Sequence, residues 1–136
     1  MRILAVDYGE RRTGLAVTDE LGITAQGLET VVVTSEDEIP ARLTGIAKNL
    51  NVGRIVLGLP LNMDGSESEK SAKVRALGEI LGAAVPSEIV YWDERMTTLI
   101  AHRVLRETGT KARGNKGVVD RISATLILQE YLTTIP

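Results

Sequence analysis

The feature that most constrains this chain is a pair of short, uninterrupted apolar runs at residues 3–6 and 55–57. A run of apolar residues without alternation is typical of a strand that is covered on both faces of a sheet. Between the two runs, apolar residues recur at the spacing of one helix face: Ile39, Leu43, Ile46, Ala47 and Leu50. A buried strand, a helix and a second buried strand predict an α/β fold in which the two strands are parallel.

The remaining strands are predicted from β-rich stretches. Residues 13–18 and 28–33 are separated by the turn sequence at 19–22, and these short spacings favour an antiparallel meander that starts with the strand at 3–6. A further strand is predicted at 88–92. We therefore expect a five-stranded mixed sheet, in which two parallel strands join the meander and helices flank the sheet.

Ser66 and Glu69 have the spacing of a capping box, which predicts the start of the second helix. This second helix is predicted at about residues 67–82, and further helices are predicted from Thr97 or Thr98 to about 107 and at 118–132. Residues 109–117 hold three glycines and three cations, and we expect them to form a solvated loop. The chain contains no internal repeat or linker, so residues 1–136 are expected to form a single domain.

Composition excludes several classes of protein. The chain has 136 residues, 43% of them hydrophobic, which is enough for a core, and a net charge of −2, which excludes binding of nucleic acid by bulk charge. It has no cysteine, so disulfides, thiolate zinc sites and cysteine nucleophiles are excluded, and a reducing compartment fits. No apolar run approaches the roughly 18 residues of a membrane span, and no secretory leader is recognisable. We expect a cytoplasmic protein with no membrane partner.

Acidic residues follow two of the strands that we predict to be parallel. Asp7 ends the first, and Asp93 and Glu94 end the last. Ligands of open α/β sheets bind at this edge. Because side chains alternate along a strand, only one of Asp93 and Glu94 is expected to face Asp7. Asp120 is a third candidate, since helical spacing places it on the same face as Ala124 and other apolar residues.

Three converging carboxylates repel one another unless a cation lies between them. Oxygen ligands favour Mg²⁺ or Mn²⁺, and two such ions about 3.5–4 Å apart can promote hydrolysis of a phosphodiester. A single acid at a strand end or in a first helical turn is ordinary. The prediction of a metal-dependent phosphodiesterase therefore depends on the topology that brings the three acids together.

Positive charge is concentrated near two of these acids. Residues 95–121 carry seven bases and two acids, whereas residues 19–38 carry six acids and no base. This local basic region favours an interaction with nucleic acid phosphates. The candidate phosphate contacts are Arg11, Arg12, Arg95, Lys111, Arg113 and Lys116.

Four motifs follow one another along nearly the whole chain. They are Asp7-Tyr8-Gly9-Glu10-Arg11-Arg12-Thr13-Gly14-Leu15-Ala16, Gly58-Leu59-Pro60 with Met63-Asp64-Gly65-Ser66, Asp93-Glu94-Arg95-Met96-Thr97-Thr98, and Val119-Asp120 followed by Ser123-Ala124 and Ile127-Leu128. Together these motifs resemble the YqgF family. The resemblance implies an RNase H-like fold and a nuclease that resolves Holliday junctions or matures the 5′ end of pre-16S ribosomal RNA. It also implies that the catalytic, metal-binding acids are Asp7, Glu94 and Asp120, with Arg95 and the loop at 109–117 beside the substrate.

The leading hypothesis is thus a two-metal endonuclease that acts on a four-way DNA junction or on precursor ribosomal RNA. One alternative is a non-catalytic nucleic-acid-binding module of the same fold. Another is the phosphate-binding hairpin of an actin-like ATPase or sugar kinase at residues 7–14, although such proteins normally need two domains. A homodimer is expected only if the substrate is a symmetric junction.

Overall fold

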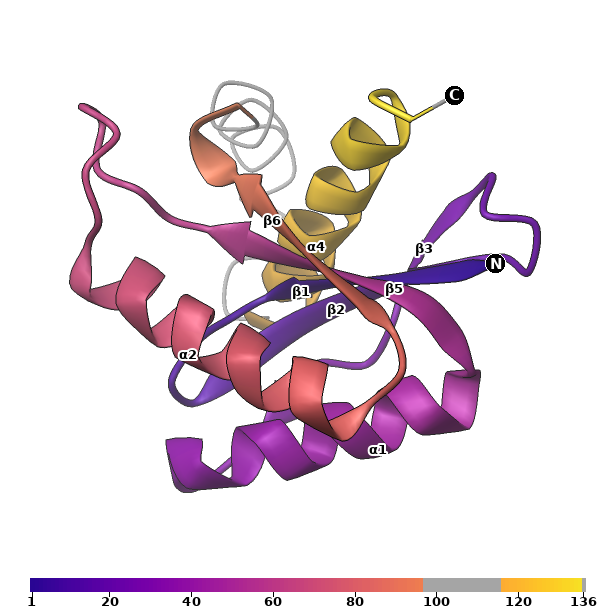
Figure 1. The fold of residues 1–136 in the computed structure, drawn as a ribbon, viewed down its shortest axis with the longest axis horizontal. Coiled ribbons are helices and arrows are strands. Elements are labelled where there is room, and N and C mark those ends of the chain that lie inside the picture. Colours follow the sequence, from indigo (N-terminus) through magenta and orange to yellow (C-terminus); the bar gives the residue numbers. More distant parts are fainter. Residues whose placement is uncertain (97–115, 136) are drawn as a thin grey trace.

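The computed structural model describes residues 1–96 and 116–135, with the backbone alone for Met96 and residues 116–120 (Figure 1). The strands are β1 (Arg2–Asp7), β2 (Arg12–Thr18), β3 (Ala25–Gly27), β4 (Val31–Val32), β5 (Val52–Leu59) and β6 (Glu88–Asp93). The helices are α1 (Ile39–Leu50), α2 (Glu69–Ala84) and α4 (Lys116–Leu132), with two short 3₁₀ turns, η1 (Glu36–Glu38) and η2 (Glu94–Met96).

The sheet is mixed and has the order β3-β2-β1-β5-β6, with β4 also paired to β2. β1 lies in the middle, antiparallel to β2, where Val6 is opposite Leu15, and parallel to β5, where Val6 is opposite Leu57. β6 is parallel to β5, and Tyr91 lies opposite Leu57. The predicted α/β architecture, with a meander followed by two parallel strands, is confirmed.

The predicted third strand at 28–33 is wrong in detail, because pairing with β2 occurs in two pieces. β3 pairs Gly27 with Ala16, whereas β4 pairs Val31 with Thr13. Three residues, 28–30, therefore lie opposite two residues of β2, and this surplus interrupts the ladder as a β-bulge does. In the described part of the chain the sheet thus has six strands, not five.

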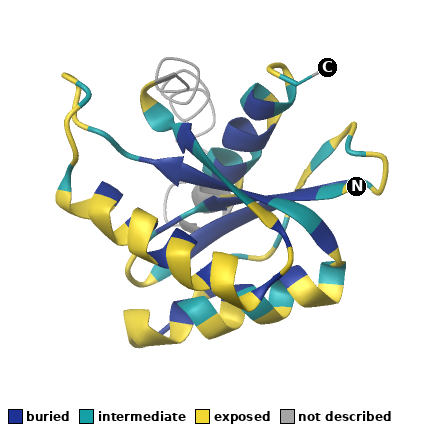
Figure 2. Cartoon of the chain, viewed as in Figure 1, coloured by how far each residue is buried: buried dark blue, intermediate teal, exposed yellow. Residues whose placement is uncertain are grey.

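Helices cover both faces of the sheet, as Figure 1 shows. Alternate residues of the central strand divide between the two faces. Leu4 and Val6 join the core under α1 and α2, whereas Ile3 and Ala5 join the core under α4. Figure 2 shows the central strands as the most buried part of the molecule. The α4 face of β1 is the one on which Asp7 falls by the same alternation.

Capping hydrogen bonds and a proline mark the places where the helices start. Ser35 and Glu38 form a capping box on η1, and Pro40 lies in the first turn of α1. The predicted cap of α2 at Ser66 is wrong, because Ser68 accepts a hydrogen bond of 2.9 Å from the backbone N–H of Ser71. Ser66 instead donates from its backbone N–H and its hydroxyl to the carboxylate of Asp64, and these hydrogen bonds close a separate turn.

α4 begins at Lys116, two residues before the predicted start, so the end of the predicted loop at 109–117 is helical. The rest of that loop and the helix predicted to end near residue 107 lie outside the described residues. Within residues 1–96 and 116–135, no helix is long and apolar enough to cross a membrane.

Candidate acidic active site

Two of the predicted acids meet at one end of the sheet. Asp7 is the last residue of β1, and Glu94 is the first residue after β6. Their carboxyl groups share a hydrogen bond, although β5 separates the two strands. Strands two positions apart lie about 9–10 Å from each other, so a side chain must extend across β5 for the two carboxyl groups to meet.

Gly58 makes this contact possible. It lies near the end of β5, paired with Trp92 of β6. A Cβ atom built on Gly58 would stand 2.5 Å from Oε1 of Glu94 and 2.9 Å from Cδ1 of Ile127 on α4. The missing side chain therefore leaves the space in which the Glu94 carboxyl crosses β5 toward Asp7. Sequence reasoning missed this role, although a glycine inside a buried strand is a signal of close approach.

The electrostatics of the pair are unfavourable in the absence of a cation. Burial raises the pKa of Glu94 to about 8, helped by the charge of Asp7 and by the hydrogen bond between them. The positive charge of Lys70, in the first turn of α2, acts in the opposite direction. The sequence motifs do not point to this residue. Two half-buried carboxyl groups that resist joint ionisation form a donor set that suits a hard divalent cation such as Mg²⁺ or Mn²⁺.

Asp93 takes a different partner. Its carboxylate accepts hydrogen bonds from Nε of Arg95 at 3.0 Å and from Nη2 at 2.7 Å, and this guanidinium lowers the pKa of Asp93. The structure thus turns Glu94 toward Asp7 and Asp93 toward Arg95. Arg95, a predicted phosphate contact, also donates from Nη1 to the carbonyl oxygen of Met63 at 3.1 Å. About a third of its side chain remains exposed.

Asp120 lies on α4, one turn before Ala124, which is buried under the sheet. Its side chain is outside the described residues, so its place beside Asp7 stays a prediction. Among the side chains that are described, no group of three acidic, histidine or cysteine residues could hold a metal ion. The described part of the candidate site is therefore the pair of Asp7 and Glu94.

The other predicted phosphate contacts are placed in part. Arg11 is exposed in the turn that follows β1 and donates to the carbonyl oxygen of Thr34 at 2.8 Å. Arg12 opens β2 and is half-buried. Lys116 starts α4 without a described side chain, and the remaining two, Lys111 and Arg113, lie outside the described residues. Arg11 and Arg12 thus stand at the same end of the sheet as the two acids.

Comparison with known structures shows the fold. The chain resembles Thermus thermophilus RuvC with a TM-score of 0.63 and 13% identity, over 98% of this chain and 96% of that one. It resembles the fowlpox virus Holliday junction resolvase with a TM-score of 0.62 and 11% identity, over 98% and 99% of the two chains. These neighbours are RuvC-like resolvases of the RNase H fold, which confirms the predicted fold class.

Comparison of sequences shows the family. A protein of Agathobacter rectalis is 44% identical over 97% of this chain and 94% of its own length, and one of Syntrophus aciditrophicus is 43% identical over 99% and 90%. Each bears the name "Putative pre-16S rRNA nuclease". Residues 1–134 match the family described as RuvX: Holliday junction resolvase, which is the YqgF family indicated by the sequence motifs. This chain therefore belongs to the RuvX family.

Proposed function

We propose that this protein is a divalent-metal-dependent endonuclease that hydrolyses phosphodiester bonds in structured nucleic acid. The observation that carries the proposal is the contact of the Asp7 and Glu94 carboxyls over Gly58, at the edge of the sheet where α/β proteins bind ligands. Membership of the RuvX family supports it, because that family is described by a nuclease reaction. The names of the curated relatives describe a nuclease as well.

Asp7 and Glu94, with Asp120 from α4, would hold Mg²⁺ or Mn²⁺, and two bound ions would activate water and offset the charge on the phosphate. The chain itself fixes the position of the carboxyl groups. The end of the central strand holds Asp7, while Gly58 and the turn η2 set the path of Glu94. Until a cation arrives, a proton between the two carboxyls relieves their repulsion, and metal binding should release it.

The arginines at this end of the sheet would contact the substrate backbone. Arg11 and Arg95 are both exposed, and both donate to backbone carbonyl oxygens that hold them in place. A guanidinium fork suits phosphate oxygens because it offers paired donors. Such contacts read the shape of the nucleic acid backbone and not its sequence. They fit either a four-way DNA junction or a folded precursor of ribosomal RNA.

A side-by-side cleavage assay tests the proposal. Wild-type protein, Asp7→Asn and Asp120→Asn would be incubated with a four-way DNA junction and with a precursor 16S ribosomal RNA, in Mg²⁺ and in Mn²⁺. We expect the wild type to cleave at least one substrate and both variants to bind it without cleavage. Full activity of Asp7→Asn would contradict the assignment. Binding without cleavage by the wild type would instead favour the non-catalytic module.

The oligomeric state provides a second test of the junction hypothesis. A junction presents two equivalent strands, so paired cuts by a two-fold dimer are expected if it is the substrate. Sedimentation of the protein with and without a junction would measure this. A monomer that cleaves ribosomal RNA alone would favour the RNA substrate.

A further inference from the structure

The loop that joins β5 to α2, residues 60–68, reaches away from the body of the protein beyond the end of β5 (Figure 1). Met63 lies in this loop with 82% of its surface exposed, more than any other large apolar side chain in the described part of the chain. Exposure of this size gains nothing for folding. A single exposed apolar side chain is ordinary, so the case for Met63 depends on the loop that carries it.

The loop is closed by its own polar groups. The side-chain amide of Asn62 donates to Oγ of Ser66 at 3.0 Å and to the carbonyl oxygen of Glu67 at 3.1 Å. The backbone of Asn62 exchanges hydrogen bonds with Ser66 and Gly65 at 2.9 and 2.8 Å. Gly65 has a positive φ of 88°, which lets the chain turn at this point. These contacts close residues 62–67 into a compact turn.

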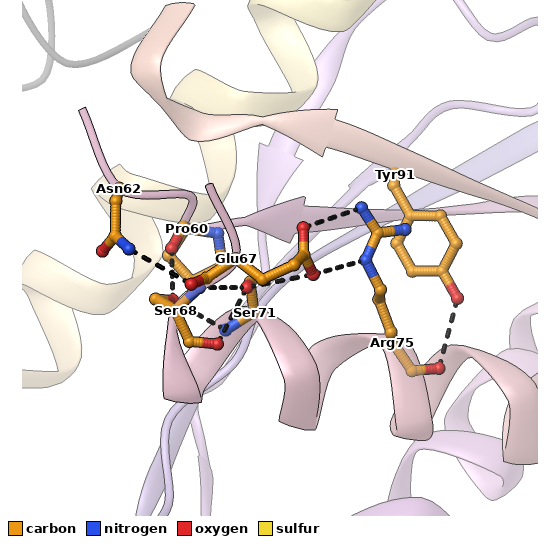
Figure 3. A network of polar contacts seen from close by, with 7 residues as sticks. All are labelled: Pro60, Asn62, Glu67, Ser68, Ser71, Arg75 and Tyr91. Carbon is orange, nitrogen blue, oxygen red and sulfur yellow. Dashed lines mark hydrogen bonds and ion pairs between the residues drawn. The ribbon is translucent and has the colours of Figure 1, made fainter. Parts of the chain in front are cut away.

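Figure 3 shows how the base of the loop is attached to the rest of the protein. The hydroxyl of Ser68 donates to the carbonyl oxygen of Pro60 at 2.6 Å, which joins the two ends of the loop. Glu67 accepts from Nε and Nη2 of Arg75 at 2.6 and 3.1 Å, and the Arg75 guanidinium lies 5.3 Å from the centre of the Tyr91 ring. The loop is thus connected to α2 and β6 through a charged pair and an aromatic ring.

Arg95 connects the tip of the loop to the candidate active site. It donates to the carbonyl oxygen of Met63, and its Nη1 lies 3.3 Å from the place a Cβ would take on Gly65. Arg95 directly follows Glu94 in η2. Met63 is therefore held by a residue adjacent to the acidic pair. Nucleic acid that reaches the acids would pass close to this loop.

Methionine is among the side chains that proteins insert beside unstacked bases. A base face is accessible at a branch point or a bulge, whereas it is stacked inside a regular duplex. The carboxylate of Asp64, the exposed acidic neighbour of Met63, accepts from the N–H and the hydroxyl of Ser66 at 2.9 and 2.6 Å. We propose that the loop at 60–68 is a preformed wedge whose Met63 packs against an unstacked base at a branch point. This inference rests on the proposed function, in that nucleic acid is the substrate.

Binding without metal tests the wedge separately from cleavage. A four-way junction with 2-aminopurine at the branch point and an unbranched duplex of equal length would be titrated with protein in EDTA. We expect Met63→Ala to bind the junction about fivefold more weakly than the wild type does, the effect of losing a side chain that becomes half-buried. Its affinity for the duplex should be unchanged, and the fluorescence change at the branch point should be smaller.

Two further variants control for shape and for exposure. Met63→Leu keeps an apolar side chain of similar volume and should behave as the wild type does. Leu21→Ala removes another large apolar side chain, 77% exposed, in the β2–β3 turn at the opposite end of the sheet, and should change neither affinity. Since Met63 is exposed, its replacement should leave the fold intact, and the fluorescence of the buried Trp92 would verify this.

Several results would overturn the wedge. They are a Met63→Ala variant that binds the junction as tightly as the wild type, an equal loss of affinity for junction and duplex, and a wild-type protein that binds neither ligand. If the wild type prefers the junction through Met63 but cleaves no substrate in any metal, the wedge stands and the proposed hydrolysis fails.

Discussion

Replacing Glu94 with glutamine should make the stability of the metal-free protein less dependent on pH. Glu94 is also a proposed metal ligand, so the effect is measured without metal. The Glu94 carboxyl lies over Gly58 and is hydrogen-bonded to Asp7, and these surroundings raise its pKa from 4.5 to about 8. Between these values the native protein holds a proton that the unfolded chain has released. The stabilisation is therefore complete below pH 4.5 and is lost as the pH rises through 8.

The size of the effect follows from this difference of one proton. Each pH unit between the two pKa values lowers the free energy of unfolding by about 1.4 kcal/mol. From pH 5 to pH 7, the wild type should thus lose about 2–3 kcal/mol relative to Glu94→Gln. The glutamine amide has nearly the same shape, carries no charge at either pH, and can donate to Asp7.

Urea unfolding in EDTA between pH 5 and pH 8 would measure this difference through the fluorescence of Trp92, the single tryptophan. Glu79→Gln, which alters an exposed acid on α2, controls for the loss of one negative charge. Addition of Mg²⁺ at pH 8 should stabilise the wild type more than Glu94→Gln. Parallel pH slopes for the wild type and Glu94→Gln would refute the reasoning, because the carboxyl would then have no unusual surroundings.

Gly58→Ala places a methyl group 2.5 Å from Oε1 of Glu94, so cleavage should fall about a hundredfold while circular dichroism shows a retained fold; unchanged cleavage would show that Glu94 needs no space there. Gly78→Ala, which would ordinarily favour a helix, should instead destabilise the protein by about 1–3 kcal/mol in thermal unfolding, because the new Cβ meets the Tyr91 hydroxyl. Tyr91→Phe should relieve part of that loss, because it removes the nearest atom while ring carbons Cζ and Cε1 stay 2.8 and 3.0 Å from the new Cβ; no relief would place the cause elsewhere. Ser68→Ala removes the cap of α2 and should lower the free energy of unfolding by about 1 kcal/mol in urea, an effect that a water-capped helix would not show.

The fold was predictable where burial alone dictates the sequence pattern. Strands β1 and β5 are apolar on both faces because helices cover both sides of the sheet, and this produces the continuous runs from which they were predicted. The break between β3 and β4 was not predictable. Val31 and Val33 are buried and Val32 is exposed, which is the alternation of an ordinary strand. The extra residue of the bulge does not change that alternation, so the pattern of buried and exposed residues does not reveal it.

The site was predictable only in outline. Asp7 follows a buried strand, so its place at the sheet edge could be derived from the topology. The choice between Asp93 and Glu94 could not, because β6 ends at Asp93 and the chain then enters η2, where strand alternation no longer applies. The role of Gly58 and the pairing of Arg95 with Asp93 arise from packing between segments distant in the sequence or from local side-chain geometry. Spacing rules contain no information about either.

The central claim is that carboxyl groups from the ends of two strands and from α4 share a divalent cation. Titration with Mn²⁺, followed by the electron paramagnetic resonance signal of the free ion, measures this without any substrate. We predict that the wild type and Glu79→Gln bind Mn²⁺ alike and that Asp7→Asn, Glu94→Gln and Asp120→Asn each bind at least about tenfold more weakly. Equal binding by all five proteins would contradict the account.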